Sequence, residues 1–119
     1  MPQVKTFKEI KAWEKAHTLV LEVYQLTKKY PKDEVFGLVS QSRRAAVSVP
    51  ANIAEGYKRY GVQDSARFYN ISAASLEELK YHLLLAKDLM YISENEYRNV
   101  DALSDETGKV LHGWIKSQN

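Results

Sequence analysis

Apolar side chains recur every three or four positions along most of this chain, a spacing typical of α-helices that bury one face. Proline and glycine interrupt the pattern at only a few places. The pattern predicts four helices, over about residues 7–30, 33–60, 63–91 and from 93 onward. The short connections between them favour antiparallel neighbours. We therefore expect residues 1–119 to form a single all-α domain, an antiparallel up-down-up-down four-helix bundle.

The predicted helix ends depend on a few residues with strong positional preferences. Pro31 ends the first helix because proline disfavours the helical conformation in the residue before it. Asp33 is a suitable N-cap for the second helix, and Gly61 is expected to end that helix. Ser93 and Glu96 have the spacing of a capping box, in which each side chain accepts a hydrogen bond from the other residue's backbone N–H.

One stretch, Ala45–Val49, has the composition of a strand, but it runs into Pro50. Ala46 lies four residues before Pro50, and its small side chain leaves room there for the proline ring. We therefore interpret this stretch as part of a kinked helix rather than a strand.

The first predicted helix carries two apolar rows, where a helix on the outside of a monomeric bundle needs one. One row is Ile10, Trp13, His17, Val20, Tyr24 and Thr27. The other row is Ala12, Ala16, Leu19, Val23, Leu26 and Tyr30. The third helix has a similar second face that includes Tyr69 and Ala73.

Surplus apolar surface of this size predicts a homo-oligomer, because contiguous exposed apolar patches mark interfaces. We assign the subunit interface to one set of residues: Ala12, Ala16, Leu19, Val23, Leu26, Tyr69 and Ala73. The alternative is that a single subunit buries both faces in one broad core.

Composition places the chain among ordinary globular proteins, with 45% hydrophobic and 27% charged residues. It has no cysteine, no apolar run long enough to cross a membrane, and no apolar signal segment near Met1. We expect a cytoplasmic protein with no membrane partner. The net charge is +2, and the basic residues are concentrated in the first half of the chain.

No motif for catalysis or cofactor binding is present. The sequence lacks glycine-rich phosphate loops, nucleophile motifs and the His-Glu-x-x-His metal motif. Glu14 and His17 have the Glu-x-x-His spacing of di-metal bundles, but such sites need a second pair that is absent here. We therefore expect no metal, no cofactor and no enzymatic activity.

Five basic residues are the candidates for nucleic-acid binding: Arg43, Arg44, Lys58, Arg59 and Arg67. They are interleaved with tyrosines, and this combination suits phosphate contact and base stacking. Two functions stay open. The protein binds structured RNA or a ribonucleoprotein, or it is a protein–protein scaffold in which these cations pair with carboxylates such as Glu55, Glu77 and Glu78.

The segment around Pro50 also contains a row of polar residues on one helix face. Ser48, Asn52 and Glu55 are spaced three and four residues apart. Such a row either caps the carbonyl that Pro50 leaves without a donor or ties neighbouring helices together through hydrogen bonds.

Nearly the whole chain resembles the bacterial four-helix bundle proteins named for intervening sequences of 23S ribosomal RNA genes. The most specific part is Arg43-Arg44-Ala45…Ser48-Val49-Pro50-Ala51-Asn52-Ile53-Ala54-Glu55-Gly56. Supporting segments are Trp13-Glu14-Lys15-Ala16, Val35-Phe36-Gly37-Leu38 and Ser75-Leu76-Glu77-Glu78-Leu79. Within the motif, we assign structural roles to Ser48, Pro50, Asn52, Glu55 and Gly56.

This resemblance implies a left-handed antiparallel bundle that assembles into a ring, typically a homopentamer, with no known catalytic activity. The chain is also similar to the accessory protein of diversity-generating retroelements, a pentameric basic barrel that engages a reverse transcriptase and nucleic acid. An RNA partner, or a protein partner that binds RNA, is therefore expected by analogy of fold.

Overall fold

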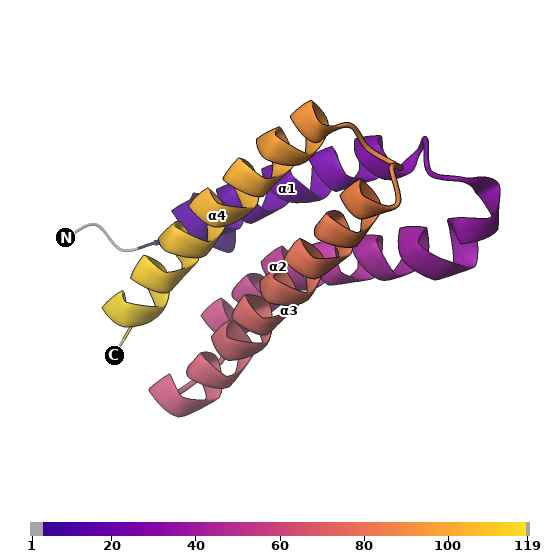
Figure 1. The fold of residues 1–119 in the computed structure, drawn as a ribbon. Coiled ribbons are helices and arrows are strands. Elements are labelled where there is room, and N and C mark those ends of the chain that lie inside the picture. The colour runs from indigo at the N-terminus through magenta and orange to yellow at the C-terminus, as the bar shows by residue number, and fades with distance from the viewer. Residues whose placement is uncertain (1–3, 119) are drawn as a thin grey trace.

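Four long helices account for most of residues 4–118, the part of the chain that the computed structural model describes (Figure 1). They are α1 (Lys11–Thr27), α2 (Ser40–Lys58), α3 (Val62–Asp88) and α4 (Glu94–Ser117). Each helix packs against its neighbours in the order α1, α2, α3, α4 and back to α1. The predicted all-α four-helix bundle is confirmed.

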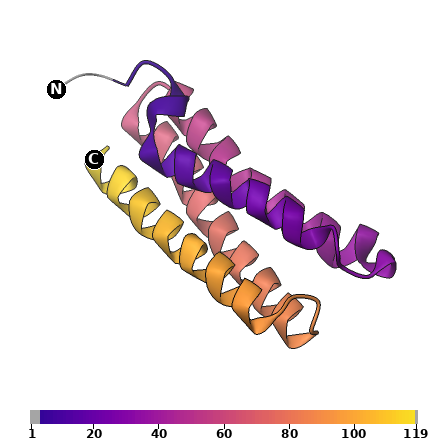
Figure 2. The same cartoon turned by 90° about the horizontal axis from the view of Figure 1, so that it is seen from above.

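Short connections place both ends of the described chain at one end of the bundle (Figures 1 and 2). The α1–α2 and α3–α4 connections lie together at the other end, where Lys29 forms an ion pair with Glu96 and Tyr91 Oη donates a hydrogen bond to Glu34 Oε2 at 2.7 Å. The bundle is elongated, with extents of 46 × 25 × 19 Å. Residues 1–3 and 119, which the predicted domain includes, lie outside the described residues.

The predicted start of the fourth helix is confirmed by its capping groups, because Ser93 and Glu96 form the complete capping box at the start of α4. The first two helices end earlier than predicted: α1 ends at Thr27, before Pro31, and α2 ends at Lys58. Gly61 is the N-cap of α3, with a φ of +85°, a conformation that favours glycine. Pro50 lies inside α2, so the strand-like stretch before it is helical.

The prediction that Asp33 caps the second helix is wrong. Asp33 lies within a short 3₁₀ turn, and a π-helical turn over Val35–Val39 precedes α2. Glu34 is the capping residue: its Oε1 accepts a hydrogen bond from the Leu38 backbone N–H at 3.0 Å. The chain bends at Gly37, whose φ and ψ are −111° and −112°, and this bend moves the start of α2 to Ser40.

The core runs along the bundle axis and is almost wholly aliphatic. Each helix contributes at least one completely buried side chain, for example Leu19, Ile53, Leu79 and Leu111. Burying each such side chain contributes about 1.5–3 kcal/mol of hydrophobic stabilisation. No helix in the described part of the chain has the length and apolar character needed to span a membrane.

Candidate protein and nucleic-acid interfaces

The outer surface formed by α1 and α2 contains a groove of about 300 Å³ with apolar walls. α1 contributes three residues one turn apart, and α2 contributes small or branched residues that face them. We name this site the α1–α2 groove, and it is lined by Phe7, Trp13, His17, Val20, Val47, Pro50, Ala51 and Ala54. His17 is the only member with a polar side chain.

Aromatic contacts fix one wall of the α1–α2 groove. The Trp13 ring stacks on the His17 ring, with centroids 5.0 Å apart and planes within 8°. Phe7 meets Trp13 edge to face at 5.1 Å. Such arrangements of aromatic rings are favourable beyond their buried area, so this wall is formed before any partner binds.

Apolar surface continues from the groove to the connection between α1 and α2. Val47 borders both the groove and a neighbouring hollow of about 510 Å³, which contains Tyr24, Val35 and Phe36. The Phe36 side chain is 95% exposed. Because the two hollows share Val47, apolar side chains continue from the groove to Phe36, and Ser40, Arg43 and Arg44 also line the second hollow. We name this surface the apolar face of α1 and α2, and contiguous apolar surface of this kind marks an interaction site.

Glu34 holds the turn that carries Phe36. Its two carboxylate oxygens accept hydrogen bonds from the Leu38 N–H and from Tyr91 Oη. These bonds, with the backbone bond the stronger influence, hold the pKa of Glu34 below its ordinary value. A Cβ atom on Gly37 would lie 2.7 Å from Glu34 Oε1, so the turn requires a residue without a side chain at that position.

The predicted assignment of the subunit interface is wrong for most of its residues. Six of them are fully buried within the single chain, each no more than 4% exposed: Ala12, Ala16, Leu19, Val23, Leu26 and Tyr69. Ala73 is half-buried and packs against the core. The reason is that α1 turns this row toward the other helices. The ends of the other row, Ile10 and Thr27, are also buried, and its middle part is half-buried at Trp13 and Val20 and exposed at His17 and Tyr24.

The candidate nucleic-acid residues fall into two groups rather than one. Arg43 and Lys58 are fifteen residues apart on α2, which corresponds to about 22 Å along a helix. Arg43 is half-buried: its Nε donates to Thr27 Oγ1 at 2.9 Å, and its guanidinium lies 4.5 Å from the centroid of the Tyr24 ring. Arg44 is exposed beside the same hollow.

The second basic group surrounds the turn between α2 and α3. Arg59 bonds Glu55 at 3.1 Å and lies 3.9 Å from Asp64, which also pairs with Arg67 at 3.0 Å. The guanidinium groups of Arg59 and Arg67 both lie over the Phe68 ring, at 4.5 and 4.9 Å. Lys58 is exposed nearby.

The polar residues of the central motif tie α2 to α3. The Ser48 and Ser75 hydroxyls are 2.8 Å apart, and Ser72 Oγ donates to the Val49 carbonyl at 2.8 Å. Asn52 Nδ2 donates to both the carbonyl and the hydroxyl of Ser48. The hydrogen bonds therefore agree with the second of the two roles considered, that of linking helices.

The other motif residues stand apart from this network. Pro50 is a wall of the α1–α2 groove, and Glu55 is the exposed partner of Arg59. Gly56 is buried against the Tyr69 ring, where a Cβ would come within 2.5 Å of a ring carbon.

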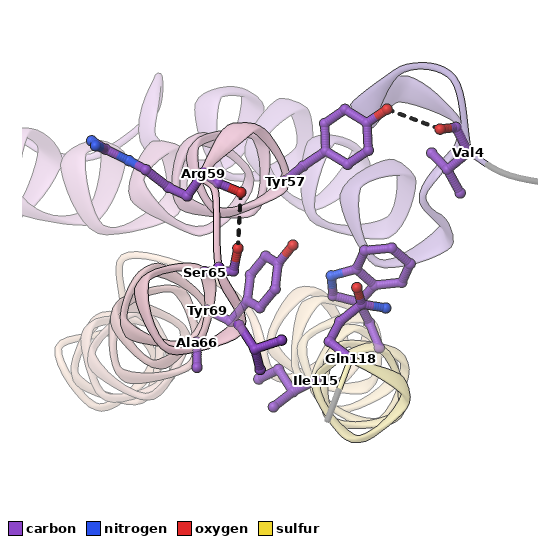
Figure 3. Close-up of a pocket in the computed structure, with 11 residues that line it drawn as sticks. Val4, Tyr57, Arg59, Ser65, Ala66, Tyr69, Ile115 and Gln118 are labelled. Atoms are coloured by element: carbon purple, nitrogen blue, oxygen red, sulfur yellow. Dashed lines mark hydrogen bonds between the residues drawn. The ribbon is translucent and has the colours of Figure 1, made fainter.

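A further cavity of about 510 Å³ lies where the C-terminal end of α4 meets the α2–α3 turn (Figure 3). Its walls include Val4, Tyr57, Tyr69 and Ile115, and Tyr57 Oη donates to the Val4 carbonyl at 2.9 Å. Figure 3 shows the Arg59 guanidinium pointing away from this cavity. No local pattern predicts this cavity, because its walls come from segments far apart in the chain.

Neither Glu14 nor His17 is arranged as a metal ligand. Glu14 pairs with Lys11 at 3.7 Å, while the His17 ring is stacked on Trp13. Within residues 4–118, no three histidine, aspartate or glutamate side chains gather closely enough to hold a metal ion.

Comparison with known proteins gives a family and a fold. The model of the 23S rRNA-intervening sequence protein family matches residues 8–113. A crystal structure of a protein with unknown function from the S23 ribosomal protein family of Bacteroides thetaiotaomicron VPI-5482 is 25% identical, with a TM-score of 0.81. The match covers 88% of this chain and 98% of that one. None of the curated proteins matches the chain.

Proposed function

The chain belongs to the 23S rRNA-intervening sequence protein family, and from that premise we propose that it is a non-enzymatic protein-interaction scaffold assembled from several copies of itself. The observation that carries this proposal is the apolar face of α1 and α2. That face combines the α1–α2 groove with a phenylalanine that is 95% exposed. Leaving so much contiguous apolar surface in water is unfavourable, and a closed homo-oligomer is the commonest way to cover it.

The basic residues also support a scaffold more than a dedicated nucleic-acid protein. The cations lie in two separate groups, and Arg59 and Arg67 already face carboxylates. The net charge of the whole chain is only +2. Both features reduce the electrostatic attraction for a phosphate backbone, which supplies most of the non-specific affinity for nucleic acids.

Light scattering tests the assembly through the absolute mass in solution. We expect a multiple of the 13.7 kDa subunit mass, five copies being the number that the family resemblance implies. Val47→Asp should reduce the mass to that of one subunit, because it places a charge in the middle of the apolar face. A wild-type particle of one subunit mass at micromolar concentration contradicts the proposal.

Ile71→Asp is the matched control for this experiment. Ile71 and Val47 are both branched residues on helices, and they are 42% and 41% exposed. Ile71 lies on α3, away from the α1–α2 groove. We therefore expect Ile71→Asp to keep the wild-type mass, and circular dichroism should show that both variants stay folded.

One observation favours RNA binding as a second candidate function. Tyr60 is 96% exposed in the α2–α3 turn, where it lines a hollow together with Lys58 and Arg59. An exposed aromatic ring beside cations is suited to stacking on an unpaired base while the cations contact phosphates. The surface ion pairs of Arg59 and Arg67 do not prevent this, because such pairs contribute little energy.

Mobility-shift titrations against a structured RNA with unpaired loops, across a range of salt, test this second function. Tyr60→Ala should weaken binding by roughly ten- to a hundredfold, because one stacked base contributes about 1–3 kcal/mol. Tyr81→Ala removes another exposed tyrosine, 59% exposed on α3, and should leave affinity unchanged. A wild-type Kd weaker than about 10⁻⁴ M at physiological salt would exclude the RNA function.

A further inference from the structure

We propose that Phe36 of one copy inserts into the α1–α2 groove of the next copy, so that the subunits join head to tail. This inference rests on the proposed self-association and specifies its contact. We call the protruding Phe36 side chain the knob. The knob and the α1–α2 groove that receives it lie on different parts of the same face.

The knob is an apolar side chain held out by a fixed turn. Phe36 is 95% exposed, although it lies between Glu34 and Leu38, which are joined by a side-chain-to-backbone hydrogen bond at 3.0 Å. The second Glu34 oxygen is bonded to Tyr91 of the neighbouring connection. A side chain presented on a turn that is already fixed loses little conformational entropy on binding, which favours its use as an anchor.

The groove has the chemistry that a phenyl ring requires. Seven of its eight lining residues are apolar, and none carries a carboxylate, amino or guanidinium group. The Trp13 ring forms one wall, and its position is fixed by Phe7 and His17. A phenyl ring that entered the groove could meet Trp13 in an offset or edge-to-face arrangement. The groove volume of about 300 Å³ is sufficient for one aromatic side chain.

Phe36 does not occupy the groove of its own subunit, because it lines the neighbouring hollow and is 95% exposed. Phe36 precedes α2, which begins at Ser40, whereas the groove centre lies at Pro50 and Ala51. Ten residues of helix, from Ser40 to Pro50, span about 15 Å, and a phenylalanine side chain is much shorter than that. The knob of one copy therefore reaches the groove of another copy that is displaced along the bundle.

In a head-to-tail interface each copy gives its knob to one neighbour and its groove to another. Such an interface gives a ring when the rotation between subunits closes and a filament when it does not. A two-fold dimer would make the same contact reciprocally, with each knob in the groove of the partner, and its mass would be that of two subunits. A wild-type mass above two subunits therefore identifies the head-to-tail arrangement, and a mass of two subunits overturns it.

The first part of the test removes the knob. Phe36→Asp is expected to reduce the mass measured by light scattering to the 13.7 kDa of one subunit. The fold should survive, because the replaced side chain is almost completely exposed. Met90→Asp is the control: Met90 is 87% exposed at the same end of the bundle but does not line the groove, so this variant should keep the wild-type mass.

The second part of the test separates knob from groove. Ala51→Glu places a carboxylate in the groove and leaves Phe36 intact, so alone it should also be a monomer. Mixing Phe36→Asp with Ala51→Glu provides one intact groove and one intact knob. The mixture should form a heterodimer that cannot grow further, visible by native mass spectrometry when one partner is isotope-labelled.

The outcomes distinguish this inference from the proposed function. If the wild-type protein is itself a monomer, the proposed self-association fails and the knob contact fails with it. If the wild type assembles and Val47→Asp dissociates it while Phe36→Asp keeps the full mass, self-association stands and the knob contact is overturned. Absence of heterodimers from the mixture of two monomeric variants also overturns the head-to-tail contact.

Discussion

His82 on α3 is a buried histidine whose protonation opposes folding. The His82 residue is only 6% exposed, and its Nε2 lies 3.5 Å from Glu78 Oε2. Burial lowers the pKa of His82 below the ordinary value, and the positive charge of Arg44 lowers it further, while Glu78 acts in the opposite direction. The folded protein therefore holds His82 neutral at pH values where an unfolded chain already binds a proton.

The sign of the resulting pH dependence follows from proton linkage. Well above the ordinary histidine pKa of about 6.5, the side chain is neutral in both states and adds no pH dependence. As the pH falls below about 6.5, the unfolded state binds the proton first, so the free energy of unfolding decreases until the folded pKa is passed. Urea unfolding of the wild type should show this loss between about pH 6.5 and 5.5, before most carboxylates titrate.

His82→Gln removes the titration and should flatten this part of the stability profile. His112→Gln is the control, because His112 is exposed on α4 and its removal should leave the slope unchanged. An unchanged slope in His82→Gln would show that another group causes the pH dependence.

Side-chain hydrogen bonds between residues close together in the chain were predictable from the sequence. Asn52 bonds Ser48 four residues away, as their spacing on one helix face indicates. The partner of Ser48 on α3, Ser75, lies twenty-seven residues further along the chain. No local pattern identifies such a contact, because it depends on how two helices are aligned.

At the scale of elements, α2 and α3 are packed closely enough to require a glycine. Gly56 on α2 faces the ring of Tyr69 on α3, and that ring is itself held edge to face against Trp114. Tyr69 is only 2% exposed, so the ring has no free space into which it can move. Interiors packed at this density do not accept an added methyl group without strain.

Gly56→Ala should therefore lower the free energy of unfolding by about 1–3 kcal/mol, despite the better helix propensity of alanine. Gly113→Ala is the matched control, because Gly113 lies inside α4 with nothing within 4 Å of an added Cβ. That variant should gain up to about 1 kcal/mol. Urea unfolding measures both, and a Gly56→Ala variant as stable as the wild type would contradict this account of the packing.

Some helix ends are set by neighbouring residues, and others are set by contacts between residues far apart in the chain. The capping box at Ser93 depends on adjacent residues and was predicted correctly. Gly61 marks the turn between α2 and α3, but as the N-cap of α3 rather than the end of α2, which ends at Lys58. The start of α2 was misplaced because the Val35–Val39 turn is held by Glu34 and, through Glu34, by Tyr91 of the α3–α4 connection. A contact over fifty-seven positions leaves no periodic signal in the sequence.

In the molecule as a whole, the four helices bury one of the two apolar rows of α1 more completely than the other. The row that begins at Ala12 combines small residues with Leu19 and Val23, so neighbouring helices can approach closely, and the bundle buries it. The row that contains Trp13 and His17 is bulkier and partly polar, and its middle part, from Trp13 to Tyr24, stays half-buried or exposed. Helical periodicity detects both rows equally, because it measures spacing and not direction.

Local sequence patterns suffice to predict the four helices, their approximate limits, the helical state of the segment around Pro50 and the excess of apolar surface on α1. These properties depend on spacing, capping and backbone chemistry among residues close in the chain. Three features become visible only in the folded molecule: which row of α1 is fully buried, the division of the basic residues into two groups, and the groove that shares one face with the exposed Phe36. Those features depend on the rotation and alignment of whole helices, which are fixed by contacts between residues far apart in sequence.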